Sequence, residues 1–276
     1  MNRLFSFFIF SAFLTLSTGC AKKKVFKPTE NANVNKSIPK KEPQAQKNSA
    51  QVSKYSQIEK DENYLKKTPT PTPTRLKNIY LTFDDGPWPE TTDAILDVLQ
   101  EYEVKATFFM NGINIKNHPN IARRVIKEGH EIGNHTYAHK DLTKLEDLKV
   151  SSEITSTNKL IEALGGKTIW VRPPYGAMSK RVDQLIKNQE MMTVFWTIDP
   201  MDWQKKLSGA RLLQRITSHL HDEGIIILHD TKSRTAMNLP LILEDLKAKG
   251  YVAKKLSERK TLPGLDRKAF TQPQFS

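Results

Sequence analysis

The sequence predicts an α/β protein in which about seven parallel strands form a distorted (β/α) barrel. From Asn78 onward, short runs rich in β-branched and aromatic residues alternate with longer segments of helical period. This alternation requires parallel pairing and right-handed crossovers, so the sheet is either open and doubly wound or closed into a barrel. No run is followed by a GxGxxG or GKS/GKT loop, which weakens the phosphate-binding versions of the open sheet.

The individual elements follow from hydrophobic periodicity, in chain order. Strands are predicted at Ile79–Phe83, Ala106–Met110, Glu131–Asn134, Ile169–Arg172, Thr193–Trp196, Ile225–Leu228 and Tyr251–Ala253. Helices are predicted at Thr91–Tyr102, Asn120–Glu128, Leu145–Leu164, Lys180–Asn188, Ser208–His221 and Met237–Lys249. In each helix apolar residues recur three and four positions apart, and a glycine often follows the last turn.

Polar and charged side chains follow the carboxyl ends of five of these strands. They are Asp84 and Asp85 after the first, His135 and His139 after the third, Arg172 at the end of the fourth, Asp199 after the fifth, and His229 and Asp230 after the sixth. An open sheet would spread these groups along a row, whereas a barrel gathers them on one rim, where barrel enzymes have their active sites. The barrel is therefore favoured, with an active site at the carboxyl-terminal rim.

Residues 1–20 are typical of an export signal. Their apolar stretch at residues 4–16 is shorter than the roughly 20 residues that span a bilayer, and Arg3 precedes it. The position of Cys20 resembles the lipidation site of a bacterial lipoprotein, although Ser17 stands where that pattern usually has Leu. Ordinary cleavage near Ala21 is the alternative. Cys20 is the sole cysteine, which excludes an internal disulfide, and we expect an exported, lipid-anchored protein.

Residues 21–77 are predicted to form a basic tether. They hold 14 Lys and Arg against 5 Asp and Glu, so most of the net charge of +13 lies in them. The segment is poor in aromatics and ends in a Thr-Pro repeat, a composition that does not bury enough apolar surface to fold. Because the predicted domain at residues 78–257 is nearly neutral, nucleic-acid binding is not expected. A polar tail at 258–276 completes the chain, which we expect to be monomeric.

His135 and His139 are four residues apart, on one face if the segment is helical. Two histidines need only one carboxylate to form a three-ligand metal site that leaves positions open for water. The spacing is that of the zinc-peptidase HExxH motif, but Thr136 replaces its glutamate, which argues against a metallopeptidase. One member of the Asp84-Asp85 pair can then be the general base while the other binds the metal.

Five ordered segments resemble the motifs of the polysaccharide deacetylase family, also called the NodB homology domain or carbohydrate esterase family 4. They are Thr82–Pro87, His135–His139, Arg172–Gly176, Asp199–Trp203 and Leu228–Asp230. The resemblance covers roughly residues 78–256, and it extends to bacterial peptidoglycan N-acetylglucosamine deacetylases. It implies a divalent metal, zinc with cobalt or manganese as alternatives, bound by Asp85, His135 and His139.

The resemblance also implies a role for each remaining motif residue. Asp84 would be the catalytic base, held by Arg172, and the backbone amide of Tyr175 would stabilise the oxyanion. His229 would be the general acid, kept protonated by the carboxylate of Asp199. Trp203 and Leu228 would shape the substrate pocket, with core packing as the alternative for Leu228. Asp202 and Asp230 are interpreted as structural residues.

These interpretations lead to a metal-dependent hydrolase that removes N-acetyl groups from an amino-sugar polymer of the cell envelope. Export and a lipid anchor would place it beside peptidoglycan, whose N-acetylglucosamine or N-acetylmuramic acid is the expected substrate. Poly-N-acetylglucosamine, chitin oligomers and acetylated xylan are alternatives. A non-catalytic carbohydrate-binding lipoprotein is the rival from another class, although such a protein would be expected to have lost Asp84 or His229.

Overall fold

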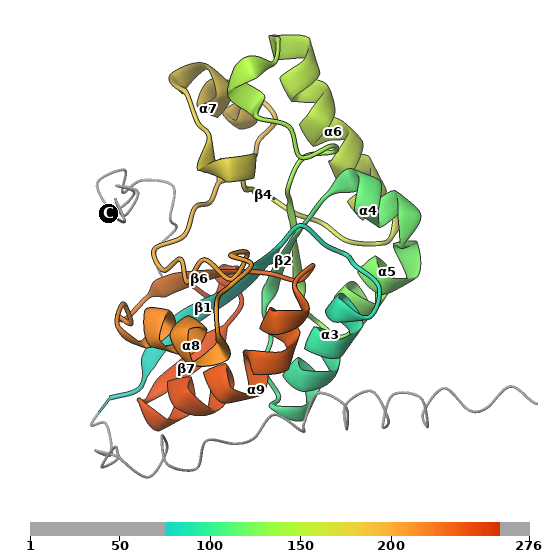
Figure 1. Cartoon of the computed structure of the whole chain (residues 1–276). Coiled ribbons are helices and arrows are strands. Elements are labelled where there is room, and N and C mark those ends of the chain that lie inside the picture. Colours follow the sequence, from blue (N-terminus) through green and yellow to red (C-terminus); the bar gives the residue numbers. More distant parts are fainter. Residues whose placement is uncertain (1–74, 260–276) are drawn as a thin grey trace, which may run out of the picture. The chain divides into compact units, whose positions relative to one another are not determined.

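The computed structural model describes residues 75–259 (Figure 1). Its seven strands are all parallel, and six of them follow the order β5-β4-β3-β2-β1-β6, with β7 paired to β1. The strands are β1 (Lys77–Asp84), β2 (Thr107–Met110), β3 (Glu131–Asn134), β4 (Trp170–Val171), β5 (Met192–Thr193), β6 (Gly224–His229) and β7 (Tyr251–Lys254). The predicted signal, Cys20, the tether up to residue 74 and the tail beyond residue 259 lie outside the described residues.

The sheet curls toward closure. The chain that follows β5 comes back to the free edge of β6, where Ile198 forms a parallel bridge with Ile226. The Ile227 N–H donates to the Ile198 carbonyl at 3.0 Å, so the segment that follows β5, rather than β5 itself, is hydrogen-bonded to β6. The predicted distorted barrel of parallel strands is confirmed.

Seven α-helices lie within residues 75–259, and six of them were predicted to within a few residues. They are α3 (Thr91–Glu101), α4 (Gly112–Asn117), α5 (Pro119–Lys127), α6 (Asp147–Ala163), α7 (Lys180–Lys187), α8 (Gly209–Thr217) and α9 (Ser233–Ala248). The unpredicted α4 has six residues, too few to show a periodic pattern. No helix in this part of the chain is both long and apolar enough to cross a bilayer.

The fifth predicted strand, Thr193–Trp196, is wrong in its last three residues, because β5 (Met192–Thr193) ends at Thr193. The carbonyl oxygens of Val194 and Phe195 accept hydrogen bonds from the Arg172 guanidinium. These carbonyls face a buried cation rather than a neighbouring strand. The sequence pattern is that of a strand, but hydrogen bonds from the Arg172 side chain take the place of backbone hydrogen bonds to a neighbouring strand.

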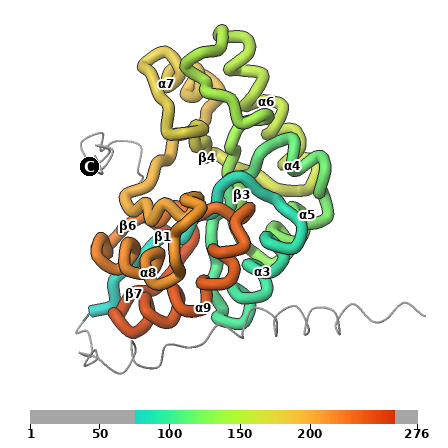
Figure 2. Tube along the Cα trace, viewed as in Figure 1, coloured from blue at the N-terminus to red at the C-terminus, as the bar shows by residue number. Residues whose placement is uncertain are grey.

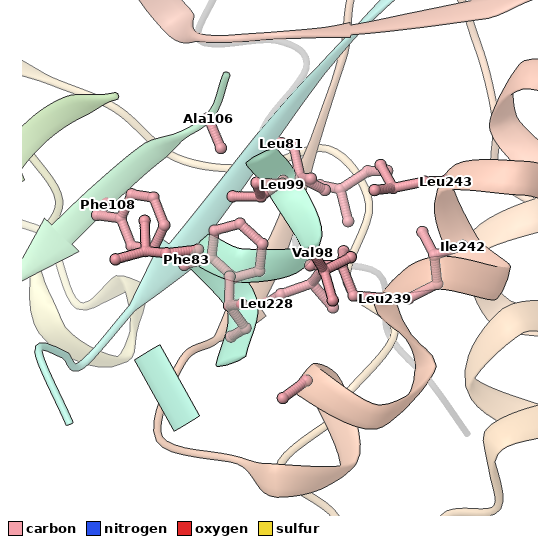
Figure 3. Close-up of a cluster of buried hydrophobic side chains, with 14 of the residues drawn as sticks. Leu81, Phe83, Val98, Leu99, Ala106, Phe108, Leu228, Leu239, Ile242 and Leu243 are labelled. Carbon is pink, nitrogen blue, oxygen red and sulfur yellow. The ribbon is translucent and has the colours of Figure 1, made fainter. Parts of the chain in front are cut away.

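The two faces of β1 have different surroundings, as the alternation of side chains in a strand requires. Leu81 and Phe83 lie in the main core under α3 and α9, and Figure 3 shows both among leucines and isoleucines of these helices. Tyr80, Thr82 and Asp84 point to the other face, the interior of the barrel. This parity brings Asp84 into the barrel at its carboxyl-terminal rim.

A separate apolar cluster joins α6 and α7 to the short strand β4, and Figure 2 shows these two helices side by side. Val150 and Ile154 of α6 and Val182 and Ile186 of α7 are buried there against Val171. The cluster fixes the end of β4, and therefore the residue that follows it, Arg172.

Candidate active site

Asp84 and Asp85 are adjacent in sequence but differ in position. Asp84 is the last residue of β1 and is 2% exposed, inside the barrel. Asp85 has a left-handed backbone conformation, with φ of 81°, which turns its side chain away from that of Asp84. Its N–H donates to the Phe109 carbonyl, and its own carbonyl accepts from the side chains of Asn111 and Asn114. The two carboxylates are therefore free to take different roles.

Asp84 forms a buried ion pair with Arg172, the residue that follows β4. The Arg172 Nη1 lies 2.6 Å from the Asp84 Oδ1, and both side chains are almost completely inaccessible to solvent. The same Nη1 donates to the Thr82 hydroxyl, while the rest of the guanidinium donates to the Val194 and Phe195 carbonyls. Burial lowers the pKa of Arg172, and the charge of Asp84 raises it, so the pair exists only because each partner compensates the other.

His135 and His139 follow β3 in an irregular loop, so helical spacing is not what aligns them. Thr136 and His139 have left-handed φ values of 66° and 52°. The Asn134 side chain accepts from the Thr136 N–H, and the buried carboxylate of Glu153 on α6 accepts from the Ala138 N–H. These bonds bend the loop so that both imidazoles face Asp85.

The three predicted metal ligands come together. The Nε2 atoms of His135 and His139 lie 3.6 and 3.3 Å from the Asp85 Oδ1, and one ligand atom from each of the three residues lies within 4.8 Å of the others. The His135 Nδ1–H donates to the Arg172 carbonyl, which leaves its Nε2 lone pair free. The His139 Nδ1 is 3.2 Å from the Tyr175 hydroxyl, so its Nε2 is free in the corresponding tautomer.

The pKa shifts of Asp85 and His139 both favour binding of a cation. Burial is the first influence on the Asp85 carboxyl and would raise its pKa, but the nearby His135, His229 and His139 lower it overall. The pKa of His139 is lowered by burial and by the neighbouring His135. An ionised carboxylate and neutral imidazoles are the protonation states that metal binding requires.

His229, at the end of β6, has Asp202 as its partner and not Asp199. The His229 Nδ1–H donates to the Asp202 Oδ1 at 2.6 Å, and the His229 backbone N–H donates to the Asp202 Oδ2 at 2.8 Å. Burial alone would lower the pKa of His229, but this hydrogen bond and the surrounding carboxylates raise it to about 9. The Asp199 side chain instead accepts from the Met201 N–H and shapes the loop. The sequence analysis interpreted Asp202 as a structural residue and so missed that it is the hydrogen-bond partner of His229.

The assignment of Leu228 to the substrate pocket is also wrong. Leu228 pairs with Phe83 across β1 and β6, is fully buried, and packs under the helices with Phe83 and Leu239 (Figure 3). Its neighbour Ile227 pairs with Thr82 and so shares the inner face with Asp84 and His229. Alternate residues of a strand share a face, so counting back two positions from His229 identifies Ile227 as the residue that faces the interior.

Tyr175 and Trp203 are both accessible to solvent, with exposures of 66% and 50%. The Tyr175 ring packs edge-on against His139, with ring centroids 4.7 Å apart. Its backbone is left-handed, with φ of 60°, and within residues 75–259 its N–H has no hydrogen-bond partner. A backbone donor without a partner beside the histidines is what an oxyanion site requires. Trp203 directly follows the His229 partner, Asp202.

The sequence model of the polysaccharide deacetylase family matches residues 71–194. The chain is 35% identical over 184 residues to a peptidoglycan-N-acetylglucosamine deacetylase of Bacillus cereus, which covers 65% of this chain and 86% of that relative. The chain belongs to the polysaccharide deacetylase family. The structure of the peptidoglycan deacetylase PdaC from Bacillus subtilis is similar to this deacetylase fold, with a TM-score of 0.62 and 35% identity over 66% of this chain and 89% of that one.

Not all similar proteins are active enzymes. A family 4 pseudoenzyme from Bacillus anthracis matches with a TM-score of 0.63 and 31% identity, over 67% of this chain and 65% of that one. Several curated relatives are longer proteins, since the chain spans 53% of one and 37% of another. Membership in the deacetylase family therefore supports hydrolytic deacetylation of a cell-wall polysaccharide, while catalysis depends on the side chains that this chain retains.

Proposed function

We propose that this chain is a metal-dependent hydrolase that removes the N-acetyl group from N-acetylglucosamine in peptidoglycan. The observation that carries the proposal is the placement of two carboxylate–cation pairs around the Asp85, His135 and His139 trio. Asp84 is held by Arg172 on one side, and His229 is held by Asp202 on the other. A base and an acid around a cation site form the minimum machinery for hydrolysing an amide.

The metal would be held by the Asp85 carboxylate and the Nε2 atoms of His135 and His139. Two imidazoles and a carboxylate suit zinc, with cobalt or manganese as alternatives. When bound, a divalent metal there polarises the acetamide carbonyl and lowers the pKa of water. The hydrogen bonds of both Nδ1 atoms fix the rings in the orientation this requires.

Asp84 is the group that takes the proton from the attacking water. Its Oδ1 is held by Arg172, while its Oδ2 lies 3.8 Å from the His135 Nε2 and so faces the metal ligands. The fixed guanidinium holds the carboxylate in one orientation. Because the pair is excluded from bulk solvent, the base does not reorganise during the reaction.

His229 is the group that protonates the departing amine. An amine leaves readily only when it is protonated, so the acid must keep its proton until the C–N bond breaks. The pKa of about 9 gives His229 that property at neutral pH, and Asp202 orients the ring so that Nε2 carries the transferable proton. The Tyr175 N–H would donate to the developing oxyanion.

The named activities of the relatives support peptidoglycan as the polymer. The Bacillus cereus relative is named for N-acetylglucosamine, whereas a Bacillus subtilis relative, 36% identical over 176 residues, is named for N-acetylmuramic acid. The export signal and Cys20 anchor predicted from the sequence would hold the domain outside the cytoplasm, next to that polymer. We favour N-acetylglucosamine, with N-acetylmuramic acid as the second candidate.

The test is metal-dependent acetate release from N-acetylated peptidoglycan fragments by the purified chain. We expect release with zinc, cobalt or manganese and none after chelation. Asp84→Asn removes the base but none of the ligands, so acetate release should fall by about 10²-fold or more while zinc still binds. The matched control is Asp147→Asn, which changes an exposed carboxylate on α6.

Two outcomes contradict the proposal. If the wild-type chain binds the glycan but releases no acetate with any of the three metals, it is a carbohydrate-binding relative of the enzymes. If Asp84→Asn abolishes zinc binding as well as activity, the roles of the two aspartates are misassigned.

A further inference from the structure

Exposed aromatic side chains gather at one end of the barrel. Within residues 75–259, the aromatic residues that are largely exposed are Trp88, Tyr175 and Trp203. Each follows the carboxyl end of a strand, on the side of the reactive groups. Tyr175 and Trp203 belong to the site already described, but Trp88 has no role in it. Trp88 is 47% exposed and lies three residues after the metal ligand Asp85.

The backbone of Trp88 is fixed on both sides by one residue of α3. The Trp88 N–H donates to the Thr92 hydroxyl at 2.7 Å, and the Thr92 N–H donates to the Trp88 carbonyl at 3.0 Å. The indole contacts His118 edge-on, with ring centroids 6.3 Å apart. An exposed aromatic on a loop normally samples several orientations, whereas this one has a fixed backbone and a neighbouring ring.

The hydrogen bonds between Trp88 and Thr92 continue into the barrel through Asp230, in the loop after β6. The Thr92 hydroxyl donates to the Asp230 Oδ2 at 2.8 Å, and Asp230 is fully buried. Its carboxyl fills the space beside Gly86, where an added Cβ would come within 1.9 Å of the Asp230 Oδ2. Any side chain at position 86 would therefore displace the loop. Asp230, Thr92 and Gly86 together determine where Trp88 stands relative to Asp85.

We propose that Trp88 stacks against a second pyranose ring of the glycan, next to the ring that is deacetylated, and that Thr92 and Asp230 are its positioning residues. The inference rests on the proposed function, because it assigns a neighbouring position to a polymeric substrate. A glycan extends beyond its reacting sugar, so its adjacent rings pass over the loops that surround the site. The apolar face of a pyranose ring covers an indole at small entropic loss when the indole is already fixed.

The first experiment measures binding and kinetics with the N-acetylglucosamine tetrasaccharide. Trp88→Ala should raise KM for the tetrasaccharide about tenfold with kcat changed less than about twofold, because a stacking contact outside the reacting centre contributes mainly to binding. Trp88→Phe should retain most of the affinity. The matched control is Ile169→Ala, which removes an equally exposed apolar side chain just before β4, at the other end of the sheet.

A second measurement separates this inference from the proposed function. Calorimetric titration of the tetrasaccharide into Asp84→Asn and into the Asp84→Asn, Trp88→Ala double variant reports binding without turnover. A Kd raised about tenfold by the second substitution supports the stacking role, even if the wild-type chain releases no acetate. If Trp88→Ala leaves both Kd and KM unchanged, Trp88 does not stack against the glycan. Acetate release by the wild type would still support the proposed function in that case. Absence of tetrasaccharide binding overturns the stacking role.

Variants of Thr92 test the positioning role. Thr92→Val removes the hydroxyl that joins Trp88 to Asp230, so KM for the tetrasaccharide should rise about threefold. Thr92→Ser keeps the hydroxyl and should restore the wild-type value. If valine and serine give the same KM, the hydroxyl does not position Trp88.

Discussion

The two sides of the site each hold a buried carboxylate against a cation at 2.6 Å, yet the two pairs differ in the kind of cation and in its exposure. On the β1 and β4 side, Asp84 meets Arg172, and both are buried. On the β6 side, Asp202 meets His229, whose side chain is 15% exposed. A guanidinium ordinarily stays protonated well above neutral pH, whereas an imidazolium changes its charge much closer to neutrality.

This difference matches the two roles proposed above, general base for Asp84 and general acid for His229. A base needs a neighbour that never competes for the proton, and arginine is such a neighbour. An acid needs a neighbour that raises its pKa without removing the proton, and a buried carboxylate does so. The same contact distance therefore serves opposite purposes because one cation is permanent and the other is titratable.

The largest expected effect comes from breaking the permanent pair. Arg172→Ala leaves the Asp84 carboxylate buried without a cation, which should lower the free energy of unfolding by about 3–5 kcal/mol. Acetate release should fall at least as far as in Asp84→Asn, because the base loses its orientation. Denaturant unfolding followed by circular dichroism gives the stability, and acetate release gives the activity.

The control for this experiment is Arg181→Ala, which breaks an exposed ion pair with Asp147 between α7 and α6. Exposed pairs contribute about 1 kcal/mol or less, so this variant should remain close to the wild type. Arg172→Lys should also be defective, because an ammonium does not reach the Thr82 hydroxyl and the Val194 and Phe195 carbonyls together. Equal stability of Arg172→Ala and the wild type would contradict the role of this pair.

Breaking the titratable pair should have a smaller effect that depends on pH. Asp202→Asn removes the charge that raises the pKa of His229, so the pKa should move from about 9 toward the ordinary value of about 6.5. Because the general acid must be protonated, kcat/KM of the wild type should decline as the pH rises through about 9. In the variant the decline should begin at a lower pH, and activity at neutral pH should fall by about tenfold to a hundredfold.

The same pair predicts how stability depends on pH. A pKa raised in the folded state contributes stability that is fully present below about pH 6.5 and is lost as the pH rises through about 9. Asp202→Asn should lose most of this contribution. Denaturant titrations at pH 6 and pH 10 measure it, and a wild-type minus variant difference that stays constant between the two would contradict the assignment.

Most parts of the site that the sequence predicted share one property: they lie directly at strand ends, with His139 farther along the loop after β3. Asp84, Asp85 and Arg172 lie within a residue of a strand, and His135 follows β3 immediately, so the convergence of strand ends at one rim places them together. The barrel was predictable for the same reason, because β/α alternation restricts the topology. Side-chain parity along β6 was also available in the sequence, and it would have placed Leu228 in the core.

The features of the site that could not be predicted from the sequence depend on the paths of loops. Asp199 and Asp202 both follow β5, and only the folded loop shows which carboxylate reaches His229. Met201 has a left-handed φ of 55°, and this turn between the two aspartates directs Asp202 toward β6. The early end of β5 has a similar origin, since the Arg172 guanidinium binds the carbonyls that a strand would have used. Such contacts between distant segments leave no local pattern.

The smallest effect is expected at Asp199, the carboxylate that the sequence analysis predicted to keep His229 protonated. Burial raises the pKa of Asp199, and its Oδ1 accepts from the Met201 N–H at 2.8 Å. Asp199→Asn keeps that acceptor, so kcat/KM should change by only a few fold and its decline above about pH 9 should stay in place. Asp199→Ala removes the acceptor, so it should be the more defective of the two because the loop that carries Asp202 loses its turn. A pH profile of Asp199→Asn that moves as far as that of Asp202→Asn would mean that the charge of Asp199, rather than the hydrogen bond from His229 to Asp202, controls the proton of the general acid.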